Sequence, residues 1–88
     1  MEVIHNLEKQ TFEIEEDGHR AYLGYKIEGE EILMYTTQVP HELGGKGVGS
    51  LLAKTALEFS REKGLKVIPL CSFVSTYIER HKEYQHCL

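Results

Sequence analysis

Cysteine, proline and long apolar runs are scarce in this chain of 88 residues. Its two cysteines, Cys71 and Cys87, are too few and too far apart for a zinc ribbon or a redox CxxC pair. No stretch approaches the roughly 18 apolar residues of a membrane span, and the first residues lack a basic segment followed by an apolar one. We therefore expect a reduced, cytoplasmic protein with two free thiols, no membrane segment and no export signal.

Positive charge is scarce as well. The chain has 10 Lys and Arg residues against 14 Asp and Glu residues, which gives a formal net charge of −4 at pH 7. Binding to nucleic acid requires a basic patch that neutralises phosphates, so nucleic acid is not an expected partner. His81, His86 and Cys87 gather near the chain end, but structural zinc normally needs four well-placed ligands. We expect no metal.

The rest of the composition is typical of a small globular protein. Hydrophobic residues make up 41% of the chain and charged residues 27%, with only two prolines. This length allows a single domain, residues 1–88, with a core of marginal size. Dimerisation is a plausible supplement to such a core, so we expect a monomer or a weak homodimer.

The N-terminal half has the pattern of antiparallel strands. A segment over residues 6–15 leads into Asp17-Gly18, a dipeptide typical of hairpin turns. Apolar and polar residues then alternate over residues 21–27, and a turn at residues 28–30 precedes a strand over residues 32–39. These three strands are expected to form a meander.

The C-terminal half changes to helical spacing. A helix is predicted over residues 47–63, with Gly64 at the position that follows a helix end. A short strand over residues 65–70 and a second helix over residues 74–80 complete the order β-β-β-α-β-α. The fold class is therefore α/β (α+β), with a strand–helix–strand unit whose two strands are parallel neighbours joined by a right-handed crossover. The apolar face of the first helix consists of Val48, Leu51, Leu52, Ala56 and Phe59.

A glycine-rich loop joins the strand over residues 32–39 to the first helix. Gly44, Gly45, Gly47 and Gly49 occupy four of six positions there. Glycine allows backbone N–H groups to converge, and the helix adds unpaired N–H groups and the positive end of its dipole. Such a loop favours an anion, most naturally a phosphate or pyrophosphate. A flexible hinge is the simpler alternative.

Two common phosphate loops do not fit this spacing. A Walker A loop requires Ser or Thr after Gly-Lys, but Gly47 follows Lys46. The dinucleotide pattern GxGxxG requires glycine where Ser50 or Leu52 stands, depending on the starting glycine. Neither a P-loop nucleotide site nor a dinucleotide site is therefore expected.

The run Gly45-Lys46-Gly47-Val48-Gly49-Ser50, after a strand that ends in Thr-x-Val, resembles the acetyl-CoA pyrophosphate loop of the GNAT superfamily of N-acetyltransferases. That loop is usually written Gln/Arg-x-x-Gly-x-Gly/Ala. Gly47 and Gly49 match its two small positions, whereas Gly44 stands where Gln or Arg is expected. The run Pro69-x-Cys71-x-Phe73, followed by Tyr77 and Tyr84, is similar to a compact branch that keeps little beyond the acetyl-CoA core.

The resemblance implies a GNAT-like fold with acetyl-CoA, or CoA, as the bound co-substrate. In that family the strand before the loop pairs through its backbone with the pantetheine arm, and the loop holds the pyrophosphate. Lys46 would lie near the CoA phosphates, although it could equally be a solvated surface lysine. The cofactor-binding residues expected in this chain are Gln38, Val39, Gly44, Gly45, Lys46, Gly47, Val48, Gly49, Ser50 and Phe73.

Three residues are candidates for catalysis. The resemblance suggests Cys71 as a nucleophile or acyl acceptor, and the helix after it could lower the pKa of its thiol. His41 could act as the general base, and Tyr77 matches the helical tyrosine that in many GNAT enzymes protonates the departing CoA thiolate. The simpler alternatives are a small buried cysteine, an exposed loop histidine and a core tyrosine.

The expected function is N-acetylation of an unidentified amine, a small molecule or a protein lysine, by direct attack or through Cys71. Larger GNAT domains add N-terminal helices and C-terminal strands that build the acceptor groove, and the resemblance covers neither. Two alternatives therefore stay open. One is a CoA-binding or sensing module without turnover, and the other is an adaptor whose open sheet edge recruits a partner strand.

Overall fold

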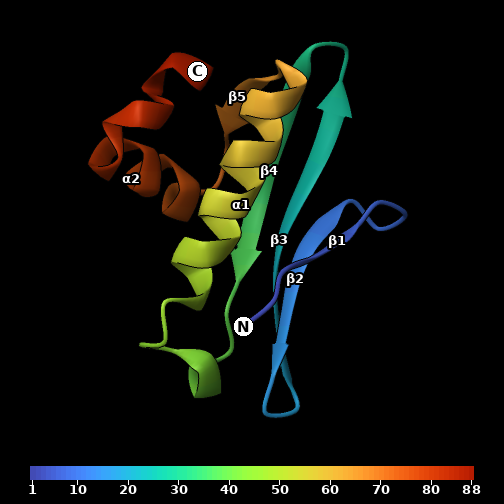
Figure 1. The fold of residues 1–88 in the computed structure, drawn as a ribbon, viewed down its shortest axis with the longest axis vertical. Coiled ribbons are helices and arrows are strands. Elements are labelled where there is room, and N and C mark those ends of the chain that lie inside the picture. The colour runs from blue at the N-terminus through green and yellow to red at the C-terminus, as the bar shows by residue number, and fades with distance from the viewer.

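A five-stranded sheet runs through the molecule, and its spatial order is the same as its chain order (Figure 1). The computed structural model describes all residues, 1–88. Neighbouring strands from β1 to β4 are antiparallel, whereas β4 and β5 are parallel. The strands are β1 (Ile4–Asn6), β2 (Thr11–Glu16), β3 (His19–Glu28), β4 (Glu31–Gln38) and β5 (Lys66–Pro69).

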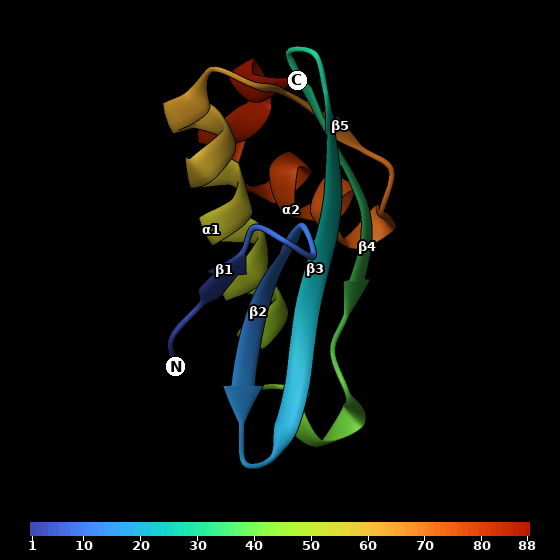
Figure 2. The same ribbon diagram turned by 90° about the vertical axis from the view of Figure 1, so that its right-hand side faces the viewer.

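Two helices and a C-terminal 3-10 segment cover one face of this sheet, as Figure 2 shows. Helix α1 (Val48–Lys63) follows β4 through the short 3-10 turn η1 (His41–Leu43), and α2 (Ser72–Arg80) follows β5. The final segment, η2 (Lys82–Cys87), packs against both helices. None of the helices is long and apolar enough to cross a membrane.

The core lies between the sheet and the helices. Period-2 alternation on the strands sends one set of side chains to the covered face, and the helical spacing of α1 supplies the opposite wall. Burial of these side chains is the main favourable contribution to folding. The fully buried strand residues are Phe12, Ile14, Ala21, Leu23, Ile32, Met34 and Val67, and those of α1 are Val48, Leu52, Ala53, Ala56, Leu57 and Ser60.

Glycine marks the predicted β2–β3 turn and the predicted end of α1, and the backbone there has the positive φ that both features require. Asp17 and Gly18 both have positive φ, 52° and 77°, as a tight hairpin between right-handed twisted strands requires. Gly64 follows α1 with φ 69°, and its N–H donates to the carbonyl of Arg61. These residues therefore set where β2 turns into β3 and where α1 ends.

Strands β4 and β5 separate before β4 ends. Their pairing stops at Met34 and Pro69, and the N–H groups of Leu70 and Cys71 both donate to the Met34 carbonyl. Beyond this point β4 continues over residues 35–38 with no strand on its β5 side. Tyr35 is the extra residue of a bulge against β3, and bulges bend a strand locally. Strand β4 lies inside the sheet, but over residues 35–38 it has an open backbone edge on its β5 side.

The fold class and the parallel strand–helix–strand unit predicted from the sequence are confirmed. The meander is one strand longer than predicted, because β1 pairs with β2 and precedes the expected three strands. The second helix begins at Ser72, two residues before the predicted start, and η2 was not predicted. Strand β4 spans Glu31–Gln38, against a predicted range of 32–39.

Candidate functional site

The glycine loop turns sharply between η1 and α1. Gly45 and Gly47 have φ of 78° and 75°, in the left-handed region that other residues rarely adopt. Gly47 is the residue directly before α1, and its carbonyl accepts the first helical hydrogen bond, from Leu51 N–H at 3.0 Å. The sequence therefore places its glycines where the chain must reverse direction and enter the helix.

The backbone N–H groups of residues 45–50 have no acceptor within the protein. The hydrogen bonds of the loop stop at Gly44 N–H, which donates to His41, and resume at Leu51 N–H. Six consecutive amides are thus free at one helix N-terminus, where the helix dipole adds partial positive charge. This arrangement can bind an anionic group with several oxygen acceptors, such as a pyrophosphate.

A cavity of about 260 Å³ opens beside these amides. It includes all of the predicted cofactor residues except Gln38 and Lys46. Leu43, which the sequence reasoning did not select, forms part of its wall. The residues that line this glycine-loop cavity are Val39, Leu43, Gly44, Gly45, Gly47, Val48, Gly49, Ser50 and Phe73.

Gln38 and Lys46 lie next to this cavity but make other contacts. Gln38 ends β4, and its side-chain amide donates to Thr36 Oγ1 at 3.0 Å. The ammonium of Lys46 lies 3.0 Å from Asp17 Oδ2, so the loop is tied to the turn between β2 and β3. Both partners of this pair are exposed, and such a pair contributes little stability.

Phe73, at the start of α2, packs directly onto the first turn of α1. A Cβ built on Gly49 would lie 2.7 Å from Phe73 Cζ, so only glycine permits this contact. The Phe73 side chain remains 41% exposed despite the contact. A large apolar ring is therefore held open to solvent at the mouth of the loop.

Cys71 lies where β4 and β5 separate. It is the residue directly before α2, and its Sγ lies 3.4 Å from Thr37 Oγ1 on the open part of β4. Its carbonyl accepts a hydrogen bond from Ser75 N–H. The thiol is partly accessible, packs against the core and also contacts Thr37 on the unpaired stretch of β4.

The pKa of the Cys71 thiol lies below its ordinary value of 9.0. Burial is the largest influence and acts in the opposite direction, because it disfavours the charged thiolate. The Thr37 hydroxyl and the N–H groups of Val74 and Phe73 at the start of α2 outweigh it, since they donate to the thiolate. The local structure thus favours a nucleophilic sulfur.

Tyr77 lies in a second cavity, of about 130 Å³, between α1 and α2. Burial raises the pKa of its phenol, and the nearby Glu83 and Glu58 carboxylates add to the increase. The phenol therefore keeps its proton at neutral pH and can donate it. This second cavity is lined by Ser50, Phe73, Thr76, Tyr77, Arg80 and His81.

The three catalytic candidates do not share a cavity. His41 is exposed on η1 and lines neither cavity, and its carbonyl accepts the hydrogen bond from Gly44. No hydrogen bond joins His41, Cys71 and Tyr77 to one another. Most of the predicted cofactor residues thus line one cavity, whereas the catalytic candidates lie apart from one another.

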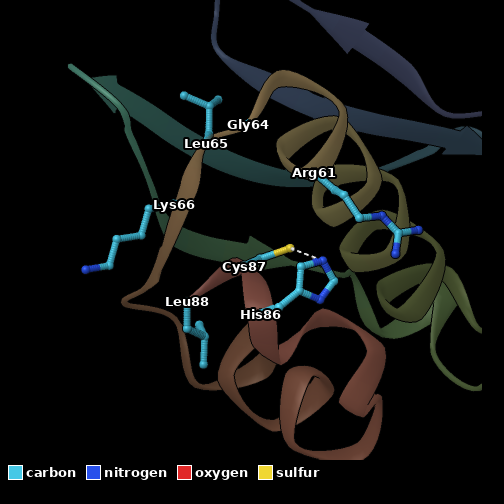
Figure 3. Close-up of a pocket in the computed structure, with 7 residues that line it drawn as sticks. All are labelled: Arg61, Gly64, Leu65, Lys66, His86, Cys87 and Leu88. Carbon is cyan, nitrogen blue, oxygen red and sulfur yellow. Dashed lines mark hydrogen bonds between the residues drawn. The ribbon is translucent and has the colours of Figure 1, made fainter.

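The largest cavity, of about 320 Å³, lies at the opposite end of α1, and Figure 3 shows its residues. Arg61 there is already engaged by the Glu58 carboxylate, with N···O distances of 2.6 and 2.7 Å. Cys87 Sγ is 3.9 Å from His86 Nε2, and Lys66 points away from both (Figure 3). No group of three or more His, Cys, Asp or Glu side chains that could hold a metal ion occurs in the structure.

The sequence reasoning missed five residues of the site: Thr37, Leu43, Thr76, Arg80 and His81. Thr37 is adjacent to Cys71 only because β4 continues past the end of β5. Arg80 reaches the second cavity from the last turn of α2. Both positions depend on tertiary packing, whereas Leu43 had a local signal as an apolar residue just before the glycines.

Comparison with known proteins points to one family. The family model described as GCN5-related N-acetyl-transferase matches residues 11–87. Protein NATD1 of Gallus gallus is 31% identical over 84 residues, which cover 92% of this chain and 76% of that protein. Protein NATD1 of Homo sapiens is 32% identical over 82 residues, which cover 90% of this chain and 73% of that protein.

A solved structure has the same fold. The NMR solution structure of a GCN5-like protein from Staphylococcus aureus superimposes with a TM-score of 0.75. It is 36% identical in sequence, and the match covers 96% of this chain and 83% of the other.

Proposed function

Because this chain belongs to the GCN5-related N-acetyltransferase family, we propose that it binds acetyl-CoA at the glycine loop and transfers the acetyl group to an amine. The observation that carries the proposal is the run of free amides over residues 45–50 at the N-terminus of α1. Their number and their position at a helix N-terminus suit the four non-bridging oxygens of a pyrophosphate.

The open edge of β4 suits the pantetheine arm. That arm contains two amide groups in an extended chain, and residues 35–38 have no strand partner along one side. An extended amide chain can add to such an edge as a further strand. Since the edge runs from the glycine-loop cavity towards Cys71, the thioester end of the arm would lie near that thiol.

In the direct route, the amine attacks the thioester carbonyl of acetyl-CoA. A base must take one proton from the amine, and His41 or a water molecule performs this step. Backbone N–H groups near Val39 stabilise the developing oxyanion. The C–S bond breaks, and the CoA sulfur receives a proton from solvent, because Tyr77 lines the second cavity rather than the glycine-loop cavity.

In the covalent route, Cys71 carries the acetyl group between the two substrates. The Cys71 thiolate attacks the thioester carbonyl, and the CoA thiolate leaves and takes up a proton. The amine then attacks the acetyl-Cys71 thioester, loses a proton and releases the Cys71 thiolate. The lowered pKa of Cys71 supports this route, because more thiolate is present at neutral pH.

A second candidate is a CoA-binding module without turnover. It is favoured by one observation: His41, Cys71 and Tyr77 do not lie in a common cavity. Such a module would bind CoA and acetyl-CoA but release no CoA in the presence of amines.

Calorimetric titration with acetyl-CoA and with CoA tests the first step of the proposal. Binding of both is expected, and binding of neither contradicts both CoA-dependent functions and leaves the adaptor alternative. Incubation with acetyl-CoA followed by mass spectrometry, with Cys71→Ala as control, then tests the covalent route. If Cys71→Ala also gains the mass of one acetyl group, Cys71 is not the residue that carries the acetyl group.

Turnover is tested by CoA release in the presence of a panel of amines that includes polyamines and lysine peptides. Release above the amine-free rate supports the acetyltransferase. Binding without release by any amine supports the CoA-binding module.

A further inference from the structure

The second cavity adjoins the glycine-loop cavity. Ser50 and Phe73 line both of them, so the two spaces share one wall. Ser50 is in the first turn of α1, next to the free amides, and Phe73 is in the first turn of α2. A ligand group bound in the second cavity would therefore lie next to one held by the loop.

One face of α2 forms most of the second cavity. Phe73, Thr76, Tyr77 and Arg80 have the spacing i, i+3, i+4, i+7, which places them along a single side of a helix. All four residues line the same space, so a phenylalanine, a threonine, a tyrosine and an arginine adjoin one cavity. No Asp or Glu side chain lines either of these two cavities.

Arg80 is available for a ligand. It makes none of the five ion pairs in the structure, which use His19, Arg20, Lys26, Lys46 and Arg61 instead. A guanidinium is always charged at physiological pH and matches the geometry of phosphate oxygens. An unpaired Arg in a cavity without acidic residues favours an anion.

His81 closes the same cavity and has a fixed orientation. Its ring stacks on Tyr77 with centroids 3.8 Å apart, and its Nδ1 lies 2.9 Å from the Tyr77 carbonyl oxygen. Because a carbonyl oxygen only accepts, Nδ1 carries the proton and Nε2 remains for another partner. The stacking keeps this side of the cavity aromatic and rigid.

We infer that the second cavity binds the 3′-phosphate on the ribose of CoA, with Arg80 as its charged partner. This inference rests on the proposed function and identifies a specificity determinant of the same site. One ribose separates that phosphate from the pyrophosphate, which matches two cavities that share a wall. A volume of about 130 Å³ holds about four water molecules, enough for a phosphate and too little for the whole adenosine. The adenosine would pack outside, against the exposed ring of Phe73.

The test compares CoA with 3′-dephospho-CoA by calorimetric titration of the wild-type protein, Arg80→Gln and Lys82→Gln. Lys82 is an exposed cation two residues away that lines neither cavity, so its replacement removes the same charge without changing the proposed contact. The wild type is expected to bind CoA about tenfold more tightly than dephospho-CoA, as one charge-assisted phosphate contact would give. Arg80→Gln should lose this preference, and Lys82→Gln should keep it.

Unchanged binding of dephospho-CoA by Arg80→Gln would show that the variant is folded and that its loop is intact. The inference is overturned if the wild type binds both ligands equally, or if Arg80→Gln weakens both by the same factor. In either case CoA still binds and the proposed function stands. If neither ligand binds the wild-type protein, the proposed function fails, and this inference fails with it.

Discussion

Cys71 and Cys87 carry the same thiol in two different surroundings. Cys71 is partly accessible at the start of α2, where hydrogen-bond donors more than offset burial and lower its pKa. Cys87 is buried in η2, and that burial raises its pKa above 9.0, with Glu58 adding to the increase and Arg61 opposing it. The position of each residue in the fold, rather than its type, determines how much thiolate it forms.

Alkylation by iodoacetamide should therefore distinguish the two thiols. In Cys87→Ser, which retains only Cys71, the rate should rise with pH through a midpoint below 9.0, since the thiolate is the reactive form. In Cys71→Ser, the remaining thiol should react more slowly and with a midpoint above 9.0. Adding Thr37→Val to Cys87→Ser should raise the Cys71 midpoint, because a hydroxyl donor is lost. Equal profiles for the two single variants would contradict this interpretation.

Gly47 offers a test of backbone conformation at a single residue. An Ala at position 47 would be strained at φ 75°, at a cost of about 1 kcal/mol in the free energy of unfolding, although its Cβ would meet no protein atom. Strain at this point should displace the free amides, so Gly47→Ala should also weaken CoA binding by about tenfold, which calorimetry would measure.

Gly29 provides the matched control. It also has positive φ, 61°, and open space for a Cβ, but it lies in the β3–β4 turn and lines no cavity. Gly29→Ala should lose a similar amount of stability and bind CoA as the wild type does. A similar loss of affinity in both variants would mean that general destabilisation, and not the loop, decides binding.

The sequence predicted the site residues unevenly, and the reason is local geometry. The glycine positions are visible in the sequence because glycine is required wherever φ is positive or a ring packs on the backbone, as at Gly47 and Gly49. Thr37 and Arg80 have no such signature. A threonine in a strand and an arginine at a helix end are common, and only tertiary packing brings them to Cys71 and to the second cavity.

At the scale of elements, a polar network joins β2 to β3 near the edge of the sheet. Glu13 accepts hydrogen bonds from Arg20 Nε at 3.1 Å and from the Thr11 hydroxyl, and its Oε2 lies 3.0 Å from Arg20 Nη2 in an ion pair. The hydrogen bonds from Arg20 and Thr11 lower the Glu13 pKa to about 2, while partial burial acts in the opposite direction. The two strands are thus linked by side chains as well as by their backbone ladder.

This network predicts a specific acid sensitivity. The folded-state pKa of Glu13 is below its unfolded value of 4.5, so its ionised form stabilises the fold fully above pH 4.5 and loses this effect as the pH falls towards 2. Glu13→Gln should lower the free energy of unfolding by about 1 kcal/mol at pH 7, the upper range for a partly exposed pair. Chemical denaturation at a series of pH values would measure the difference, which should vanish near pH 2.

Glu8→Gln is the control for this experiment, since Glu8 is exposed and belongs to no ion pair. It should leave the stability unchanged at pH 7. A difference between wild type and Glu13→Gln that persists unchanged at pH 2 would exclude ionisation of Glu13 as the cause.

Elements with a strong period or a continuous apolar run were predicted, whereas the short elements β1, η1 and η2 were not. The alternation in β3 and the helical spacing in α1 extend over many residues, and caps such as Gly64 mark their ends. Strand β1 has three residues, Ile-His-Asn, without any alternation. It is a strand because the β2 edge is available and because His5 stacks on Phe12 with ring centroids 4.1 Å apart. The pairing of β1 with β2 depends on contacts that exist only in the folded molecule, so the local sequence does not predict it.

At the scale of the whole molecule, the features of the proposed site converge at one end of the sheet. Strand β4 continues past β5, α1 begins beside the end of β4, and α2 begins where β5 ends (Figure 1). The sequence predicted this topology because a strand–helix–strand crossover makes its strands parallel neighbours. It did not reveal where β4 and β5 separate, since that depends on the Tyr35 bulge and on the turn at Leu70 and Cys71.

The central claim is that the free amides of residues 45–50 bind the CoA pyrophosphate, and amide-resolved NMR tests it most directly. Acetyl-CoA added to ¹⁵N-labelled protein should shift the backbone amide resonances of residues 45–50 most strongly, with a second set over residues 35–38 of β4. Spectra unchanged at millimolar acetyl-CoA would contradict the claim. So would shifts confined to the opposite cavity, around Arg61 and Cys87.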